Sequence, residues 1–216
     1  ISYAQNGEDV VLHRALGDVV NGVFIDVGAA DPVIDSVTWA FYQRGWSGIN
    51  FEPVKDFADM YPPLRSRDTT IRAGVGAEPG RRTFYIAEGT GLSSLDEKDA
   101  QSAADLGYTI VESEIEIVTL NDTLSDVYPL GTEIHFLKID VEGFEGPVIA
   151  GNDWTVRRPW VVVVEATRPT SQEVTVDWEP MVLGAGYHYV YGDGLNRYYV
   201  DDAHAELDDA FAWPPN

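Results

Sequence analysis

Residues 135–140 read HFLKID, and they run directly into the turn VEGFE at residues 141–145. A strand that is apolar on both faces and ends in a carboxylate is typical of the centre of a parallel sheet. A second strand of this kind, WVVVVE, occupies residues 160–165. Between the two, residues 145–150 predict a short helix that ends at Gly151. This strand–helix–strand order predicts that the two strands are neighbours in one sheet.

The same alternation extends over the rest of the chain. Further strands are predicted at residues 22–28, 48–53, 69–75, 82–86 and 115–118, and helices at residues 6–16, 36–44, 56–64 and 120–127. We expect Pro62 and Pro63 to break the third helix, and residues 89–109 to form a loop with some helix. Residues 187–191 and 197–200 flank a glycine-rich turn and predict a hairpin. The pattern predicts a three-layer α/β fold with a mostly parallel sheet and an antiparallel edge.

The composition fits one globular domain over residues 1–216. The chain has 14 Lys+Arg against 36 Asp+Glu, which gives a formal net charge of -22. Such a surface repels phosphate backbones and anionic lipids, so we expect neither nucleic acid nor a membrane as a partner. The charge is compatible with neutral substrates, cations and metal ions as ligands, and a homodimer is also compatible with the sequence.

The chain contains no cysteine, which excludes disulfides, thiolate zinc sites and a cysteine nucleophile. No stretch approaches the roughly 20 apolar residues of a membrane span, and the sequence shows no basic-then-apolar leader. These features predict a cytoplasmic protein.

Four of the predicted strands end in a carboxylate, namely Asp26, Glu52, Asp140 and Glu165. In open α/β sheets, ligands bind at the carboxyl ends of the strands. We therefore expect these four acids to gather around one crevice.

The turn after residue 137 brings three charged side chains close together. Because side chains alternate along a strand, Lys138 and Asp140 point to the same side, and Glu142 follows closely. One lysine cannot neutralise the four acids of the predicted crevice. Carboxylates that repel one another in a crevice indicate a bound cation, a substrate proton or raised pKa values.

The turn after the first strand, residues 26–32, contains Gly28, which lets the backbone lie close to a ligand. It lacks the G-x-G-x-x-G pattern of a pyrophosphate site, which disfavours a nicotinamide oxidoreductase, and Asp31 would repel a phosphate. Glu52, roughly 20 residues further on, stands where an acid accepts hydrogen bonds from ribose hydroxyls. These residues predict a nucleoside cofactor, although acids that merely cap helices in an ordinary Rossmann-like fold would produce the same pattern.

Five segments together resemble the FkbM-type family of S-adenosylmethionine-dependent O-methyltransferases. They are SYAQNGED at residues 2–9, FIDVGA at 24–29, NFEP at 50–53, FLKIDVEGFE at 136–145 and DGLNRYY at 193–199. The last segment resembles the glycan-modifying branch of the family. The resemblance implies a Rossmann-like class I methyltransferase sandwich, with a seven-stranded, mostly parallel sheet and a C-terminal antiparallel hairpin.

The resemblance also implies roles for individual residues. The cofactor S-adenosylmethionine is expected to contact Asp26, Gly28, Ala30, Asp31, Ser36, Glu52 and Pro53. A sugar or oligosaccharide substrate is expected to contact Gln5, Glu8, Asp193 and Asn196. The N-terminal helix, within residues 1–20, would then serve as a lid, although its acidic first turn is equally typical of an ordinary helix start.

The implied reaction is transfer of a methyl group from S-adenosylmethionine to a hydroxyl, with Asp140, Glu142 and Lys138 as the catalytic residues. Asp140 and Glu165 could hold magnesium or manganese, which would lower the pKa of the acceptor hydroxyl. Alternatively Lys138 neutralises the acids, and Asp140 or Glu142 is the general base. A methyltransferase for non-sugar molecules and a non-catalytic nucleoside- or glycan-binding module are the competing functions.

Overall fold

The computed structural model describes residues 1–167 and 173–215. Its main feature is a seven-stranded sheet in which β10 runs antiparallel to both of its neighbours and the other pairings are parallel. In spatial order the strands are β3 (Thr69–Ile71), β2 (Ser47–Phe51), β1 (Val23–Val27), β7 (Phe136–Ile139), β8 (Val161–Glu165), β10 (Asn196–Asp201) and β9 (Tyr187–Gly192). The expected seven-stranded sheet with a C-terminal antiparallel hairpin is confirmed.

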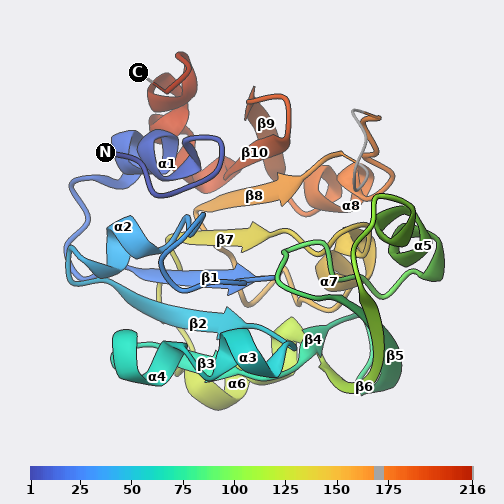
Figure 1. The fold of residues 1–216 in the computed structure, drawn as a ribbon. Coiled ribbons are helices and arrows are strands. Elements are labelled where there is room, and N and C mark those ends of the chain that lie inside the picture. The colour runs from blue at the N-terminus through green and yellow to red at the C-terminus, as the bar shows by residue number, and fades with distance from the viewer. Residues whose placement is uncertain (168–172, 216) are drawn as a thin grey trace.

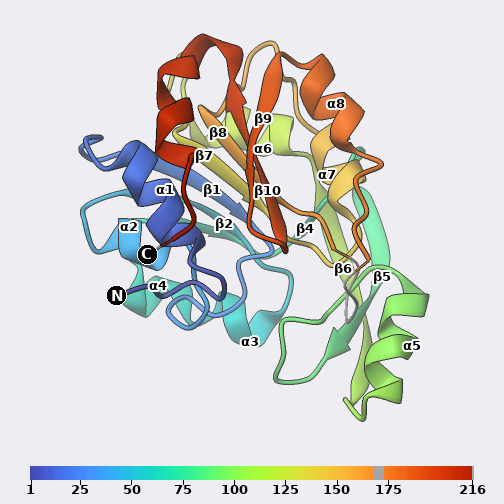
Figure 2. The ribbon, with the colours of Figure 1, turned by 90° about the horizontal axis from the view of Figure 1, so that it is seen from above.

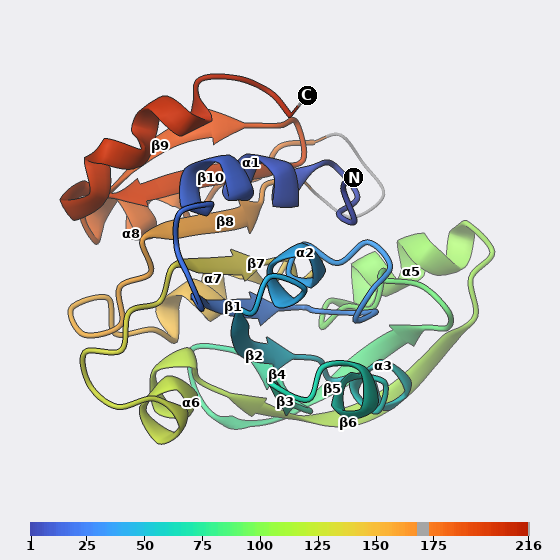
Figure 3. The same cartoon turned by 90° about the vertical axis from the view of Figure 1, so that its left-hand side faces the viewer.

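Helices cover both faces of this sheet, as Figure 3 shows from one side. One face carries α1 (Glu8–Leu16), α2 (Trp39–Tyr42) and the 3₁₀ segment η1 (Asp202–Phe211), and the other carries α6 (Leu120–Val127), α7 (Glu145–Ala150) and α8 (Glu179–Gly184). Side chains alternate along β1, so Phe24 packs in the hydrophobic core under α1, α2 and η1, and Ile25 packs in the core under α6, α7 and α8. The resulting three layers match the expected α/β class.

A second, three-stranded sheet lies beyond the carboxyl ends of β1, β7 and β8 (Figures 1 and 2). It consists of β4 (Gly74–Val75), β6 (Ile110–Val118) and β5 (Gly80–Ala87), and α5 (Glu97–Asp105) packs against it. The prediction of one strand over residues 69–75 was wrong. Ala73 donates a hydrogen bond to the carbonyl oxygen of Ile71, and this tight turn separates β3 from β4.

Two predicted helices also differ from the structure. The helix predicted at 36–44 is only the single turn α2, because the hydroxyls of Ser36 and Thr38 are engaged in a buried network described below. The segment at 56–64 forms two short helices, α3 (Lys55–Ala58) and α4 (Tyr61–Leu64). The two prolines, Pro62 and Pro63, begin α4 and do not break it, since proline is tolerated in the first turn of a helix.

The two ends of the chain lie side by side (Figure 2). Arg14 of α1 donates hydrogen bonds to the carbonyl oxygens of Ala210, Trp213 and Pro214. Phe211, which is buried, packs with α1 in one core. No helix among the residues that the structure describes could cross a membrane.

Candidate active site

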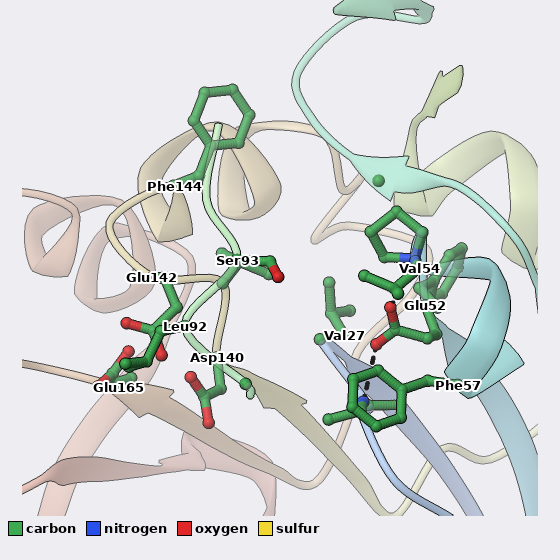
Figure 4. A pocket seen from close by; sticks show the side chains of 18 of the residues that line it. Val27, Glu52, Val54, Phe57, Leu92, Ser93, Asp140, Glu142, Phe144 and Glu165 are labelled. Carbon is green, nitrogen blue, oxygen red and sulfur yellow. Dashed lines mark hydrogen bonds between the residues drawn. The ribbon is translucent and has the colours of Figure 1, made fainter. Parts of the chain in front are cut away.

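A cavity of about 810 Å³ lies at the carboxyl edge of the main sheet, between that edge and the second sheet. Glu52, Asp140 and Glu165, three of the four acids at strand ends, line it as expected. Figure 4 shows Asp140, Glu142 and Glu165 together on one side and Glu52 with Val54 and Phe57 on the other. The cavity therefore has two acidic ends of different make-up.

At the first end, Glu52 is only 4% exposed, and backbone groups hold its side chain. Its two carboxylate oxygens accept hydrogen bonds from the backbone nitrogens of Ala30, at 2.8 Å, and Val54, at 2.6 Å. Burial raises the pKa of Glu52 to about 7. Each oxygen retains a lone pair that can accept a further hydrogen bond from a ligand. Pro53, also predicted to contact the cofactor, lines the same end.

The turn from Gly28 to Asp31 forms the floor between the two ends. Gly28 has a φ of +79°, and a Cβ atom there would lie 1.8 Å from the carbonyl oxygen of Asp140. Only glycine allows β1 and β7 to approach so closely at this point. Ala30, with a φ of +48°, also adopts the left-handed conformation. Gly28, Ala30 and Asp31 all line the cavity, so this turn is available to a ligand.

Asp31 has a local partner as well. Its Oδ1 atom accepts hydrogen bonds from the backbone nitrogens of Val33 and Ile34, both at 2.8 Å. This is an Asx turn, which holds the loop after Ala30 in shape.

Asp26 and Ser36 do not line the cavity and lie behind this loop. Thr38 donates a hydrogen bond to Asp26 Oδ2 at 3.1 Å and accepts one from Arg65 at 3.0 Å. Arg65 also donates to Ser36 Oγ at 3.3 Å. Asp26 and Ser36 thus take part in a network behind the cavity lining, and the contacts predicted for them with the cofactor stay predictions.

Arg65, which is fully buried, was missed by the sequence analysis. Its guanidinium lies 5.2–5.4 Å from the ring centres of Phe24, Tyr42 and Tyr61 and forms an ion pair with Asp68 at 2.7 Å. Tyr61 and Asp68 are close to Arg65 in the sequence, but Phe24 and Tyr42 come from distant elements, so the full surroundings of Arg65 depend on tertiary contacts.

Lys138 lies between the loop and the second end of the cavity. Its Nζ atom donates a hydrogen bond to the Gly28 carbonyl oxygen at 3.0 Å and is 3.4 Å from both Asp26 and Asp140. Burial alone would lower the pKa of Lys138, but the carboxylates of Asp26 and Asp140 outweigh it and raise the pKa. Lys138 is therefore a fixed positive charge, and the prediction that it shares a side with Asp140 is confirmed.

The second end consists of Asp140, Glu142 and Glu165, which we call the carboxylate cluster. One oxygen from each lies within 4.8 Å of the others. Glu142 Oε2 and Glu165 Oε2 are buried without a hydrogen-bond partner among residues 1–167 and 173–215. Burial, followed by repulsion from Asp140, raises the pKa of Glu165 strongly and that of Glu142 as well. Such a cluster can hold a cation or a shared proton.

Of the four residues predicted to contact substrate, Gln5 lines the cavity, whereas Glu8, Asp193 and Asn196 do not. Asn196 donates hydrogen bonds to Glu8 Oε1 at 3.0 Å and to Asp193 Oδ2 at 3.2 Å. The Glu8 carboxylate is buried, which raises its pKa. These three residues fasten the N-terminal segment to the β9–β10 turn, and their neighbour Leu195 reaches the cavity.

Other walls of the cavity come from residues outside the predicted set of site residues. Residues 89–93 and Leu95 come from the loop between β5 and α5, and Phe144 and Thr167 flank the carboxylate cluster. The loop is rich in glycine and serine, which sequence reasoning could not distinguish from an ordinary connection.

The methyltransferase FkbM domain model matches residues 26–189, which is most of the chain. The chain belongs to this family. The matched region contains the Gly28 turn, Glu52 and the carboxylate cluster, all of which line the cavity. Family membership makes S-adenosylmethionine the methyl donor.

Two solved structures are similar to this FkbM methyltransferase domain. A TehB-like SAM-dependent methyltransferase from Corynebacterium glutamicum has 9% identity and a TM-score of 0.47, over 90% of this chain and 87% of that one. CalO1, a methyltransferase in calicheamicin biosynthesis in its SAH-bound form, has 12% identity and a TM-score of 0.43, over 91% of this chain and 54% of that one. No curated protein matches the sequence.

Proposed function

We propose that this methyltransferase transfers the methyl group of S-adenosylmethionine to a hydroxyl of a sugar or oligosaccharide. The observation that carries the proposal is the carboxylate cluster, which borders the cavity opposite Glu52 and has two buried oxygens without a partner in the described part of the chain. O-methylation requires a hydroxyl proton to be accepted beside the methyl donor. A cluster of carboxylates next to a nucleoside site supplies that acceptor.

The donor would occupy the end of the cavity formed by Glu52 and the Gly28 turn. The Glu52 carboxylate is already fixed by two backbone hydrogen bonds, so it can accept hydrogen bonds from ribose hydroxyls without reorganising. The Gly28 turn, whose residues Gly28, Ala30 and Asp31 line the cavity, would form the other wall of the donor site. The cavity volume of about 810 Å³ falls in the upper part of the usual range of roughly 300–1,000 Å³, which suits a donor and an acceptor together.

Asp140 is our choice for the group that accepts the proton. It lies at the carboxyl end of β7, its side chain is 31% exposed, and it lines the cavity. Lys138, at 3.4 Å, holds its carboxylate in place. Glu142 would be the alternative base if Asp140 serves only to orient the acceptor.

We include a divalent cation, magnesium or manganese, in the proposal. The cluster offers three carboxylates, and hard cations take a few such ligands and keep several waters. The unpartnered oxygens of Glu142 and Glu165 fit this role, because a buried acceptor without a partner is costly. A bound divalent cation would supply positive charge that makes a nearby hydroxyl more acidic.

The acceptor class follows from charge and from the terminal sequence block. Six carboxylates line the cavity against the single described cation Lys138, so an uncharged acceptor is favoured over an anionic one; the acids are Asp31, Asp35, Glu52, Asp140, Glu142 and Glu165. Residues 193–199 resemble the glycan-modifying branch, which favours a sugar. The proposal also places the protein in the cytoplasm as a homodimer. It includes neither nucleic acid nor a membrane as a partner.

Mass spectrometry of a panel of sugars, incubated with the protein and S-adenosylmethionine, tests the acceptor. We expect one added methyl group on a neutral sugar and none on its phosphorylated counterpart. Methylation restricted to non-sugar hydroxyls would contradict the sugar assignment, and S-adenosylmethionine binding without transfer to any acceptor would indicate a non-catalytic binding module.

Chelation tests the cation separately. EDTA should abolish methyl transfer, and added magnesium or manganese should restore it in the wild type but not in Glu165→Ala. Full activity in a metal-free preparation would remove the cation from the proposal and leave Asp140 or Glu142 as a direct general base.

A further inference from the structure

The turn that carries the carboxylate cluster has a strained backbone. Glu142 has a φ of +53°, and Gly143, the next residue, has a φ of +95°. A left-handed conformation at a residue other than glycine persists only when the surroundings enforce it. Within the turn, Glu145 Oε1 accepts hydrogen bonds from the backbone nitrogens of Val141 and Gly143, but neither bond holds the Glu142 carbonyl.

The Glu142 carbonyl is held by Ser94, which lies in the loop between β5 and α5. Ser94 Oγ donates a hydrogen bond to this oxygen at 3.0 Å, and Ser94 is 1% exposed. Its own backbone is fixed, because it exchanges two hydrogen bonds with Tyr85 of β5, at 2.9 and 3.0 Å. Ser94 Oγ also accepts a hydrogen bond from the backbone nitrogen of Asp96, at 3.0 Å, which orients the hydroxyl.

Two further contacts join the second sheet and its helix to the same turn. The Arg82 guanidinium of β5 lies 5.8 Å from the centre of the Phe144 ring. A Cβ atom at Gly143 would come within 3.0 Å of a carboxylate oxygen of Asp99 in α5. The second sheet thus packs along the turn, and Ser94 makes the hydrogen bond at its strained residue.

We propose that Ser94 is a positioning residue for the carboxylate cluster. Its hydroxyl holds the Glu142 peptide in the left-handed conformation, and this directs the Glu142 carboxylate toward Asp140 and Glu165. The inference deepens the proposed function and rests on it, since it assigns the second sheet the task of maintaining the cation-binding end. Ser94 itself does not line the cavity, although Ser93 and Leu95 on either side of it do.

Manganese binding to the whole protein, followed by electron paramagnetic resonance, tests this role without an acceptor. Manganese bound at the carboxylate cluster is identified as the part of the binding that is lost in Asp140→Asn. Ser94→Ala should weaken it about 10- to 100-fold, the range seen when residues that orient metal ligands are lost. Ser94→Thr, which keeps the hydroxyl, should restore it. Affinity for S-adenosylhomocysteine should stay near the wild-type value in both variants, and the melting temperature of Ser94→Ala should fall only by the amount that the loss of one buried hydroxyl produces.

Ser102→Ala is the matched control. Ser102 Oγ donates a comparable hydrogen bond at 3.0 Å to the Lys98 carbonyl oxygen, but on the exposed side of α5, so its loss should leave manganese affinity unchanged. Unchanged manganese affinity in Ser94→Ala, failure of Ser94→Thr to restore it, or a wild type without this binding component would overturn the proposal. Failure of the proposed sugar methylation would appear separately, in the acceptor assay.

Discussion

Glu52 and Glu165 are both buried acids at the ends of parallel strands, yet their surroundings are opposite. They are 4% and 7% exposed. Both oxygens of Glu52 accept backbone hydrogen bonds, whereas Glu165 Oε2 has no partner among the described residues and lies beside two further carboxylates. Burial is therefore not what distinguishes the two ends. At the Glu52 end the carboxylate is held by the protein backbone and is ready to accept hydrogen bonds from a ligand. At the Glu165 end the carboxylates need a cation or a proton to satisfy the unpartnered oxygen and to reduce their mutual repulsion.

The largest expected effect separates the two ends by chemistry. Asp140→Asn keeps the size of the side chain but removes the base, so turnover should fall about 10²- to 10⁴-fold. The affinity for S-adenosylmethionine should hardly change, because that affinity depends on the Glu52 end. Stopped turnover with unaltered calorimetric binding is the expected combination. An equal loss of both would mean that the two ends are not separate.

A smaller effect is expected at the other end. Glu52→Ala should weaken S-adenosylmethionine binding by about 1.5–3 kcal/mol, or about 10- to 150-fold, the scale of hydrogen bonds to charged groups. Because the pKa of Glu52 is about 7, the wild-type affinity should rise as pH increases through that value and the carboxylate ionises toward a cationic ligand. Calorimetry across pH should show this rise in the wild type and in Glu78→Ala, an exposed control, but not in Glu52→Ala. A pH-independent wild type would contradict the role of Glu52.

The smallest effect concerns the free energy of unfolding. The carboxylate cluster and the neighbouring Glu145 should lower it in the ligand-free protein as pH rises. The raised pKa values of Glu165, Glu142 and Glu145 mean that the folded, ligand-free protein keeps protons that the unfolded chain has lost above about pH 4.3. Their contribution to stability is complete below that value. This contribution is lost as pH rises through the folded-state pKa values of these groups, and for Glu145 that pKa is about 7.

Glu165→Gln should therefore stabilise the ligand-free protein near pH 8, by about 0.5–2 kcal/mol, while methyl transfer is lost. Urea unfolding of the wild type and the variant at pH 5 and pH 8 measures the difference. A variant that is less stable than the wild type at pH 8 would show that the Glu165 carboxyl group already makes favourable interactions in the ligand-free protein.

Sequence patterns predicted the main sheet and the convergence of acids because both depend on local rules. Strands ending at Asp140 and Glu165 have to meet at one edge if they are parallel neighbours, and the register pairs Ile139 with Val164. Two strands of the second sheet were predicted, at residues 82–86 and 115–118, but their assembly into a separate sheet was not. The third strand, β4, contains only two residues, and it pairs with β6, which lies far along the chain.

The supporting networks could not be predicted for the same reason. Glu8 and Asn196 lie 188 positions apart, and Arg65 is surrounded by rings from separate elements. The family resemblance assigned Glu8, Asn196, Asp26 and Ser36 to ligands. In the structure each of them has at least one protein hydrogen bond, to a residue that is brought near by the fold.

A crystal structure with S-adenosylhomocysteine and manganese would show whether the donor lies against Glu52 and the acceptor chemistry at the carboxylate cluster. We expect ribose hydroxyls within hydrogen-bonding distance of Glu52 and an anomalous manganese peak among Asp140, Glu142 and Glu165. A ribose bound at the cluster, or manganese at another site with the cluster protonated, would contradict this expectation.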